Sequence, residues 1–233
     1  MIFSFEAAMR QVNDLMHRYK DLKILSYDDN QIIVQGVINV NREFDDYTLC
    51  RNYRLKVIVP INSDDMPRAI EVGNQIDYNY VHRYPDGELC LDTDTAIRIR
   101  FVNGFSLCDW MYEYVETYFF SYEYFQRYGV FPFGEREHGM FGVLQTYEEL
   151  LDVSDYVSAI RFMRSISKEK YRGHLLCPCG SGIILRKCHG KAVYKYYDDK
   201  RLNKIVNDDF KMIGKELDEY DKKSRNTGKA KRS

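Results

Sequence analysis

Four residues near the C-terminal end of the sequence have the types and the spacing of a metal site. They are Cys177, Cys179, Cys188 and His189. Structural zinc sites hold the ion with four cysteine or histidine ligands at the corners of a tetrahedron. Four such ligands seldom fall by chance within so short a segment. We therefore predict one structural Zn²⁺ held by these four side chains.

The C-x-C-x8-C-H spacing of this segment resembles the SEC-C motif. This motif is a small zinc knuckle found at the end of the SecA translocase and on many unrelated bacterial proteins. The resemblance is confined to residues 173–193, where all four ligand positions are present and His174 is the alternative ligand. A site closed by four protein ligands has no position for water, so we expect the metal to be structural and the knuckle to dock a partner rather than to catalyse a reaction.

Cys90 could carry a different chemistry, nucleophilic acyl transfer. It follows the turn residues Tyr84-Pro85-Asp86-Gly87, and a loop of this kind can present a side chain to a partner. A thiol accepts an acyl group from another thioester, and the product stays reactive toward amines and hydroxyls. The acidic residues around Cys90 disfavour a thiolate, which suits a nucleophile activated by its partner and not a redox sensor. The alternative is a small buried apolar residue.

Residues 1–151 together resemble the ubiquitin-conjugating enzymes, in particular their divergent bacterial members. That family has an N-terminal helix, an antiparallel meander, and then an irregular segment with a histidine, a glycine and the catalytic cysteine. His82, Gly87 and Cys90 follow in this order, and residues 87–91, Gly-Glu-Leu-Cys-Leu, match best. The polar loop that contains His138 also resembles a segment after the crossover helix of bacterial relatives. The resemblance implies that Cys90 is the catalytic cysteine.

One departure from the family concerns catalysis. Conjugating enzymes commonly carry His-Pro-Asn before the cysteine, and the asparagine stabilises the oxyanion or organises the loop. The matching positions here are His82, Arg83 and Tyr84, so the asparagine is missing. The tetrahedral intermediate still needs hydrogen-bond donors. The candidates are His82, the Tyr84 hydroxyl, backbone N–H groups and, if the second loop folds over Cys90, His138. A structural role is the alternative for both histidines.

The resemblance also implies a set of partners. A ThiF-like activating enzyme would load a ubiquitin-like protein onto Cys90, a metallopeptidase would reverse the conjugation, and such bacterial systems are often linked to defence against phage. The zinc knuckle would recruit one of these partners. Two other hypotheses remain open: a non-catalytic binding module with the same fold, and a SEC-C adaptor that recruits clients to a partner.

Composition excludes several classes of protein. Of the 233 residues, 45% are hydrophobic and 15% aromatic, which excludes wholesale disorder. A net charge of -1 gives no reason to expect nucleic-acid binding. No apolar stretch is long enough to span a membrane, and the first residues lack the features of a signal peptide. We therefore expect a cytoplasmic protein, in which six cysteines point to metal or catalysis rather than disulfides.

The elements that would position these residues predict an α+β fold. It has an N-terminal helix, an antiparallel β-meander and C-terminal helices, as in the ubiquitin-conjugating fold, with a small zinc knuckle appended. Apolar spacing predicts a helix over residues 3–20, three strands over 31–40, 53–59 and 69–76, and a long helix over 107–128 whose aromatic stripe we interpret as core packing. Shorter helices are predicted over residues 146–151 and 153–167.

Changes in composition predict the domain boundaries. We expect a ubiquitin-conjugating-like domain over 1–151, a helical connector over 152–172, the knuckle over 173–193, a charged helix over 194–221 and a disordered basic tail over 222–233.

Overall fold

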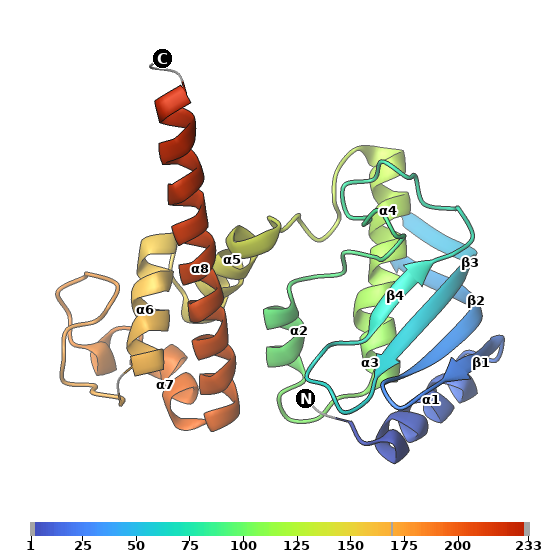
Figure 1. Ribbon diagram of the computed structural model, residues 1–233, viewed down its shortest axis with the longest axis horizontal. Helices are drawn as coiled ribbons and strands as arrows, with labels where there is room; N and C mark the ends of the chain where they lie inside the picture. Colours follow the sequence, from blue (N-terminus) through green and yellow to red (C-terminus); the bar gives the residue numbers. More distant parts are fainter. Residues whose placement is uncertain (1–2, 169, 231–233) are drawn as a thin grey trace. The chain divides into compact units, whose positions relative to one another are not determined.

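The computed structural model describes residues 3–168 and 170–230, with side chains described through residue 219. The chain forms two compact units, each of which is described by itself (Figure 1). The first unit comprises Met1–Asp92 and Asn103–Glu135, and the second comprises Thr93–Val102 and Arg136–Ser233.

The first unit combines an antiparallel sheet with an N-terminal helix and a long later helical segment, and the two helical segments contact each other. Its elements are α1 (Phe5–Arg18), β1 (Leu22–Tyr27), β2 (Gln31–Phe44), β3 (Tyr47–Pro60), β4 (Arg68–Glu71), α3 (Leu107–Trp110), the π-helical turn η1 (Met111–Val115) and α4 (Glu116–Tyr128). The strands form an antiparallel meander in the order β1-β2-β3-β4. An N-terminal helix, an antiparallel sheet and later helices are thus confirmed.

Both helical segments of the first unit, α1 and the segment over 107–128, form where the sequence predicts them. The Ser4 hydroxyl accepts a hydrogen bond from the Ala7 N–H and caps α1, whose buried side chains repeat at helical spacing. The predicted helix over 107–128 is confirmed as α3, η1 and α4, and α4 lies across one face of the sheet (Figure 1). Trp110 is fully buried and Phe119 stacks on Tyr53 of β3, so the aromatic stripe is core.

The sequence did not predict β1. Of its side chains only Leu22 is buried, while Leu25 and Tyr27 are exposed. The segment therefore lacks the alternation of apolar and polar residues that indicates a half-buried strand. Its pairing with β2 comes from backbone hydrogen bonds that leave no trace in the pattern of residue types.

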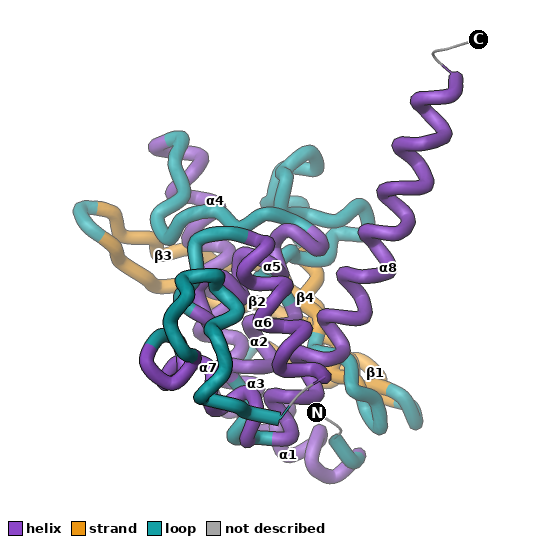
Figure 2. Tube along the Cα trace, turned by 90° about the vertical axis from the view of Figure 1, so that its left-hand side faces the viewer, coloured by secondary structure: helices purple, strands orange, loops and turns teal. Residues whose placement is uncertain are grey.

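The second unit is helical. It contains α2 (Asp94–Arg100), α5 (Gly139–Leu151), α6 (Tyr156–Lys168), the 3-10 turn η2 (Leu185–Lys187), α7 (Gly190–Asp198) and α8 (Lys200–Ala230). Apolar side chains from α5, α6, α7, α8 and the cysteine-rich segment share one core. α8 continues past the other helices of the unit (Figure 2).

The unit boundaries differ from the predicted domains. The domain expected over 1–151 loses α2 and α5 to the second unit, because α5 buries Leu144 and Tyr147 in the helical core. The predicted connector over 152–172 contains α6, which also belongs to that core. The charged helix expected over 194–221 is two helices, separated at Asp199. The predicted disordered tail, residues 222–233, lies outside the residues whose side chains are described.

Within the described residues, no helix is both long enough and apolar enough to cross a membrane.

Candidate active-site loop and candidate metal centre

The backbone of the loop that carries Cys90 is tied to the sheet. The Gly87 N–H donates to the Tyr84 carbonyl and the Tyr84 N–H donates to the Glu88 carbonyl, so that residues 84–88 form a tight turn. The Leu89 N–H then donates to Ala69 of β4 at 2.9 Å. The loop therefore extends the edge of the sheet, and Cys90 comes directly after Leu89, which is hydrogen-bonded to β4.

Gly87 is the residue that this turn requires. Its φ of +86° is in the left-handed region, which favours glycine. A Cβ at this position would lie 3.2 Å from the Glu71 carbonyl oxygen and 3.3 Å from Ile70 Cγ2. Both the backbone conformation and the close approach to β4 therefore disfavour a side chain here.

We expect Gly87→Ala to destabilise the first unit by more than Gly129→Ala does. Both glycines have a positive φ, and the left-handed conformation costs an alanine about 1–2 kcal/mol. A Cβ at Gly129 meets no atom within 4 Å, so this variant isolates the conformational cost. Urea unfolding of both variants measures the difference, and equal losses would show that the contact with β4 is unimportant.

The Cys90 thiol is half-buried and sits beside a tyrosine hydroxyl. The backbone N–H of Cys90 donates to the His82 carbonyl at 2.9 Å. The Tyr84 hydroxyl lies 3.8 Å from Sγ, where it can donate a hydrogen bond to a thiolate. Burial raises the pKa of the thiol, and the carboxylates of Asp92 and Glu88 raise it further, while the Tyr84 hydroxyl lowers it. The resting side chain is therefore a protonated thiol at neutral pH.

The His82 ring is held by its neighbours. Its Nε2 lies 3.2 Å from Glu135 Oε1, and the ring packs edge-on against Tyr80 and Phe131. Only 14% of the side chain is exposed. These contacts join the Cys90 loop to the segment that follows α4, which suits the structural alternative for this histidine.

His138 belongs to the second unit. It is exposed and directly precedes α5. The segment around it is fixed to that helix, because the Arg136 guanidinium makes two hydrogen bonds to the Glu149 carboxylate and the Glu137 N–H donates to Gln145. Its predicted action on Cys90 stays a prediction.

The four predicted metal ligands come together in the second unit. All their ligand atoms lie within 4.8 Å of one another, and His174 is not part of the cluster. The sulfurs of Cys179 and Cys188 are 3.7 Å apart, and His189 Nδ1 is 3.3 Å from the Cys177 sulfur. Two thiolates on a tetrahedral zinc are about 3.8 Å apart, from a Zn–S bond of about 2.3 Å. The cluster could therefore hold a metal ion.

Groups around the cluster orient its ligands. His189 Nε2 donates to the Asp152 carbonyl at 2.8 Å, which leaves the lone pair of Nδ1 directed toward the sulfurs. Metal-bound histidines usually have such a partner on the second ring nitrogen. The Ser181 hydroxyl lies 3.5 Å from the Cys188 sulfur. Neither partner was predicted: Ser181 stands between the two glycines of the motif, but no sequence signal marks Asp152.

The electrostatics of the cluster favour ionisation of one thiol, Cys179, before that of Cys177. Burial opposes ionisation of Cys179, but hydrogen bonds from Ser181 and from the neighbouring thiols lower its pKa to about 6. Burial raises the pKa of Cys177 to about 11. A cluster with one ionised thiol is suited to capture a cation, which then ionises the remaining thiols.

The cysteine-rich segment is built into the helical core. Cys177 and Leu185 are buried together with residues of α6 and α7. The Phe162 ring of α6 packs against the His189 ring at 5.3 Å. The metal cluster and the helices around it therefore form one packed unit.

No protein-family model, curated protein or solved structure matches this chain.

Proposed function

We propose that the chain is a conjugating enzyme for a ubiquitin-like protein, with Cys90 as the acceptor of the thioester. The observation that carries this proposal is the position of Cys90. It follows an N-terminal helix and a four-stranded antiparallel meander, and it precedes the long helix that packs on the sheet. The family that residues 1–151 resemble has its catalytic cysteine in this order of elements.

The proposed reaction is a transfer of an acyl group between two sulfurs. Cys90 Sγ attacks the carbonyl carbon of a thioester between the modifier and its activating enzyme. A new C–S bond forms, the C–S bond to the activating enzyme breaks, and the thiol proton of Cys90 passes to the leaving sulfur. An amine or hydroxyl then displaces Cys90 in a second transfer.

The oxyanion of each tetrahedral intermediate needs a donor near Cys90. In the first unit the Tyr84 hydroxyl lies 3.8 Å from Sγ, and a ring nitrogen of His82 lies within 4.8 Å of that sulfur. We propose that the Tyr84 hydroxyl takes over part of the role of the missing asparagine. Burial, together with the carboxylates of Asp92 and Glu88, raises the pKa of the Cys90 thiol and keeps it protonated until a partner binds, which limits side reactions of the free enzyme.

We further propose that the metal is zinc and that it is structural. Three cysteines and one histidine form a set of four soft and borderline ligands, which suits Zn²⁺. The ion would fix the loop between α6 and α7. Its proposed functional role is to shape a surface that docks a partner such as the activating enzyme or the modifier, in an antiphage pathway.

Reconstitution tests the enzymatic proposal. The purified chain is mixed with a ThiF-like activating enzyme, the ubiquitin-like protein that this enzyme activates, and ATP. We expect an adduct on a non-reducing gel that disappears on addition of dithiothreitol. Full charging of the activating enzyme with no adduct on this chain would contradict the proposal.

A non-catalytic binding module or a SEC-C adaptor is the alternative. Two observations favour it: the family asparagine is absent, and burial raises the pKa of the Cys90 thiol. In this case the modifier or a client binds without ATP, and the binding survives Cys90→Ala. The reconstitution separates the two proposals, because only the enzyme forms a thioester.

The two histidines are expected to differ in effect. His82→Ala removes the contact with Glu135 and should lower the free energy of unfolding by roughly 1–3 kcal/mol. If His138 donates to the oxyanion, His138→Ala should slow discharge of preformed thioester by about 10²–10³-fold and affect charging less. Single-turnover discharge and thermal melting measure both, and an unchanged discharge rate would return His138 to a structural role.

A further inference from the structure

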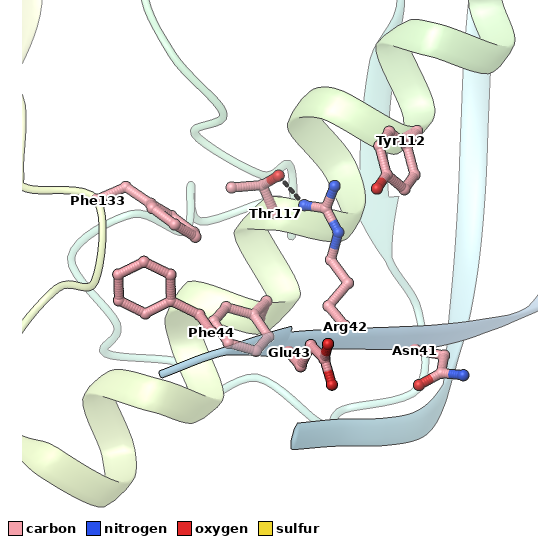
Figure 3. A pocket seen from close by; sticks show the side chains of 8 residues that line it. Asn41, Arg42, Glu43, Phe44, Tyr112, Thr117 and Phe133 are labelled. Atoms are coloured by element: carbon pink, nitrogen blue, oxygen red, sulfur yellow. Dashed lines mark hydrogen bonds between the residues drawn. The ribbon is translucent and has the colours of Figure 1, made fainter. Parts of the chain in front are cut away.

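A pocket in the first unit is lined by the end of β2, by the helical segment that contains η1 and α4, and by Phe133. Its volume is about 700 Å³. Figure 3 shows the side chains that line it: Asn41, Arg42, Glu43, Phe44, Tyr112, Thr117, Phe120 and Phe133. Four consecutive residues of β2 contribute, so the pocket follows the strand.

One edge of β2 is open along this pocket. β1 pairs with β2 only as far as Gly36, whereas β3 pairs with β2 to its end at Phe44. Among the described strands, none pairs with residues 37–44 on the β1 side. An unpaired strand edge is a template for an additional strand.

The hydrogen-bond pattern shows which residues face this edge. The Arg54 carbonyl of β3 accepts from the Val72 N–H, so the polar groups of Arg54 point away from β2. Val37 is paired with Arg54 in an unbroken register, and its N–H and C=O therefore point away from β3. Because the direction alternates along a strand, the same orientation applies to Asn39, Asn41 and Glu43.

A cation marks one end of the pocket. Arg42 donates to the Thr117 hydroxyl, and its guanidinium carbon lies 4.2 Å from the centre of the Tyr112 ring (Figure 3). Glu116 is 3.7 Å away, and the side chain of Arg42 is only 16% exposed. The Glu116 carboxylate pairs with Nε and the Thr117 hydroxyl accepts from one terminal nitrogen, so the remaining N–H groups of the guanidinium are the donors for a further planar anion such as a carboxylate. Arg18 also lies on the Tyr112 ring, 5.1 Å from its centre.

An aromatic wall forms the other end. The rings of Phe44 and Phe133 are 5.1 Å apart, and Phe120 lies 6.1 Å from Phe133. Phe133 is 56% exposed, which is unusual for so large an apolar side chain beside a pocket. An apolar side chain on these rings would gain contact area without displacing a charged group.

We propose that this site binds an extended peptide that adds a strand to the open edge of β2. Its backbone pairs with Asn39, Asn41 and Glu43, a peptide carboxylate binds Arg42, and a neighbouring apolar side chain packs on the aromatic wall. This mode of recognition takes affinity from main-chain hydrogen bonds and specificity from the flanking pockets. The proposal does not depend on the chemistry of Cys90.

Three synthetic peptides test the proposal by NMR titration of the ¹⁵N-labelled full chain. They are Thr-Val-Thr-Val-Phe with a free C-terminus, the same peptide as an amide, and Thr-Val-Glu-Val-Phe amide. We expect the largest amide shifts at Val37, Asn39, Asn41 and Glu43, with smaller shifts at the alternate residues. The two carboxylate-bearing peptides distinguish a terminal from a side-chain carboxylate, and the uncharged amide should bind about tenfold or more weakly.

Variants test each part separately. Asn41→Pro removes an outward N–H without touching the pairing with β3, and should abolish binding, whereas Asn41→Ala should retain it. Arg42→Gln should remove the preference for a carboxylate, while Arg54→Gln, an exposed arginine on β3, should not. Far-ultraviolet circular dichroism shows that each variant is folded. Unchanged binding by Asn41→Pro, shifts spread over both sets of alternate amides, or no binding of any peptide would overturn the proposal.

Discussion

The Cys179→Ser variant is expected to lose its metal and to unfold most of the second unit. Cys179 is one of four residues whose ligand atoms form the cluster, and three protein ligands hold zinc much less tightly than four. Structural zinc contributes about 10–16 kcal/mol of apparent binding free energy in small zinc domains, which exceeds the stability of most domains. Because Cys177 and Leu185 are packed with α6 and α7, loss of the metal should extend to the helices.

Elemental analysis and hydrogen exchange measure these two effects. Wild-type protein should contain one zinc per chain, and Cys179→Ser should contain none. Amide protection should fall in α5, α6 and α7 and persist in the sheet of the first unit. Cys108→Ser is the matched control, because Cys108 belongs to the first unit and should leave both zinc and protection unchanged. Wild-type protein without zinc would refute the metal assignment.

Replacement of Cys90 is expected to have the largest effect on activity. Cys90→Ala should abolish adduct formation, and Cys90→Ser should give either a thiol-resistant oxyester or no adduct, because a hydroxyl is a far poorer nucleophile than a thiol at neutral pH. Cys50→Ser and Cys108→Ser should form the adduct as the wild type does. A thiol-sensitive adduct that survives in Cys90→Ser would show that another cysteine carries the modifier.

The raised pKa of Cys90 predicts the direction of its pH dependence. Alkylation by iodoacetamide requires the thiolate, so the rate should rise about tenfold per pH unit up to the thiol pKa. At pH 7 the reaction should be slower than that of the exposed Cys50. Tyr84→Phe removes the hydroxyl that lowers the pKa and should slow the reaction further. Faster alkylation of Cys90 than of Cys50 would contradict the electrostatic account.

Elements with a strong local pattern could be predicted from the sequence. The helix over 107–128 and the strands β2 and β3 combine apolar periodicity with clear turn residues, and the structure contains all three elements. α2 and β1 were missed, because α2 has only seven residues and β1 buries little. Their formation depends on distant partners: the Thr95 hydroxyl of α2 donates to Asp209 of α8.

The sites show the same difference between features marked by a local sequence pattern and features that depend on distant residues. The metal ligands were predicted because all four lie within one short segment and each residue type has few other uses at that spacing. The partner of His189, a carbonyl at Asp152, could not be predicted, since any residue type supplies a carbonyl. The peptide pocket joins β2 to helices more than sixty residues later in the chain, so no local pattern of residues marks it.

The division of the chain into interleaved units also governs the order in which the protein can fold during synthesis. Thr95 leaves the ribosome 114 residues before Asp209, its hydrogen-bond partner. At about 5–20 residues per second this interval is roughly 6–23 s. During that time the sheet of the first unit can fold, while Ile99 of α2, which packs against the helical core of the second unit, waits for its partners. A chain truncated before Asp209 should therefore leave α2 exposed to chaperones and proteases, even when its sheet is intact.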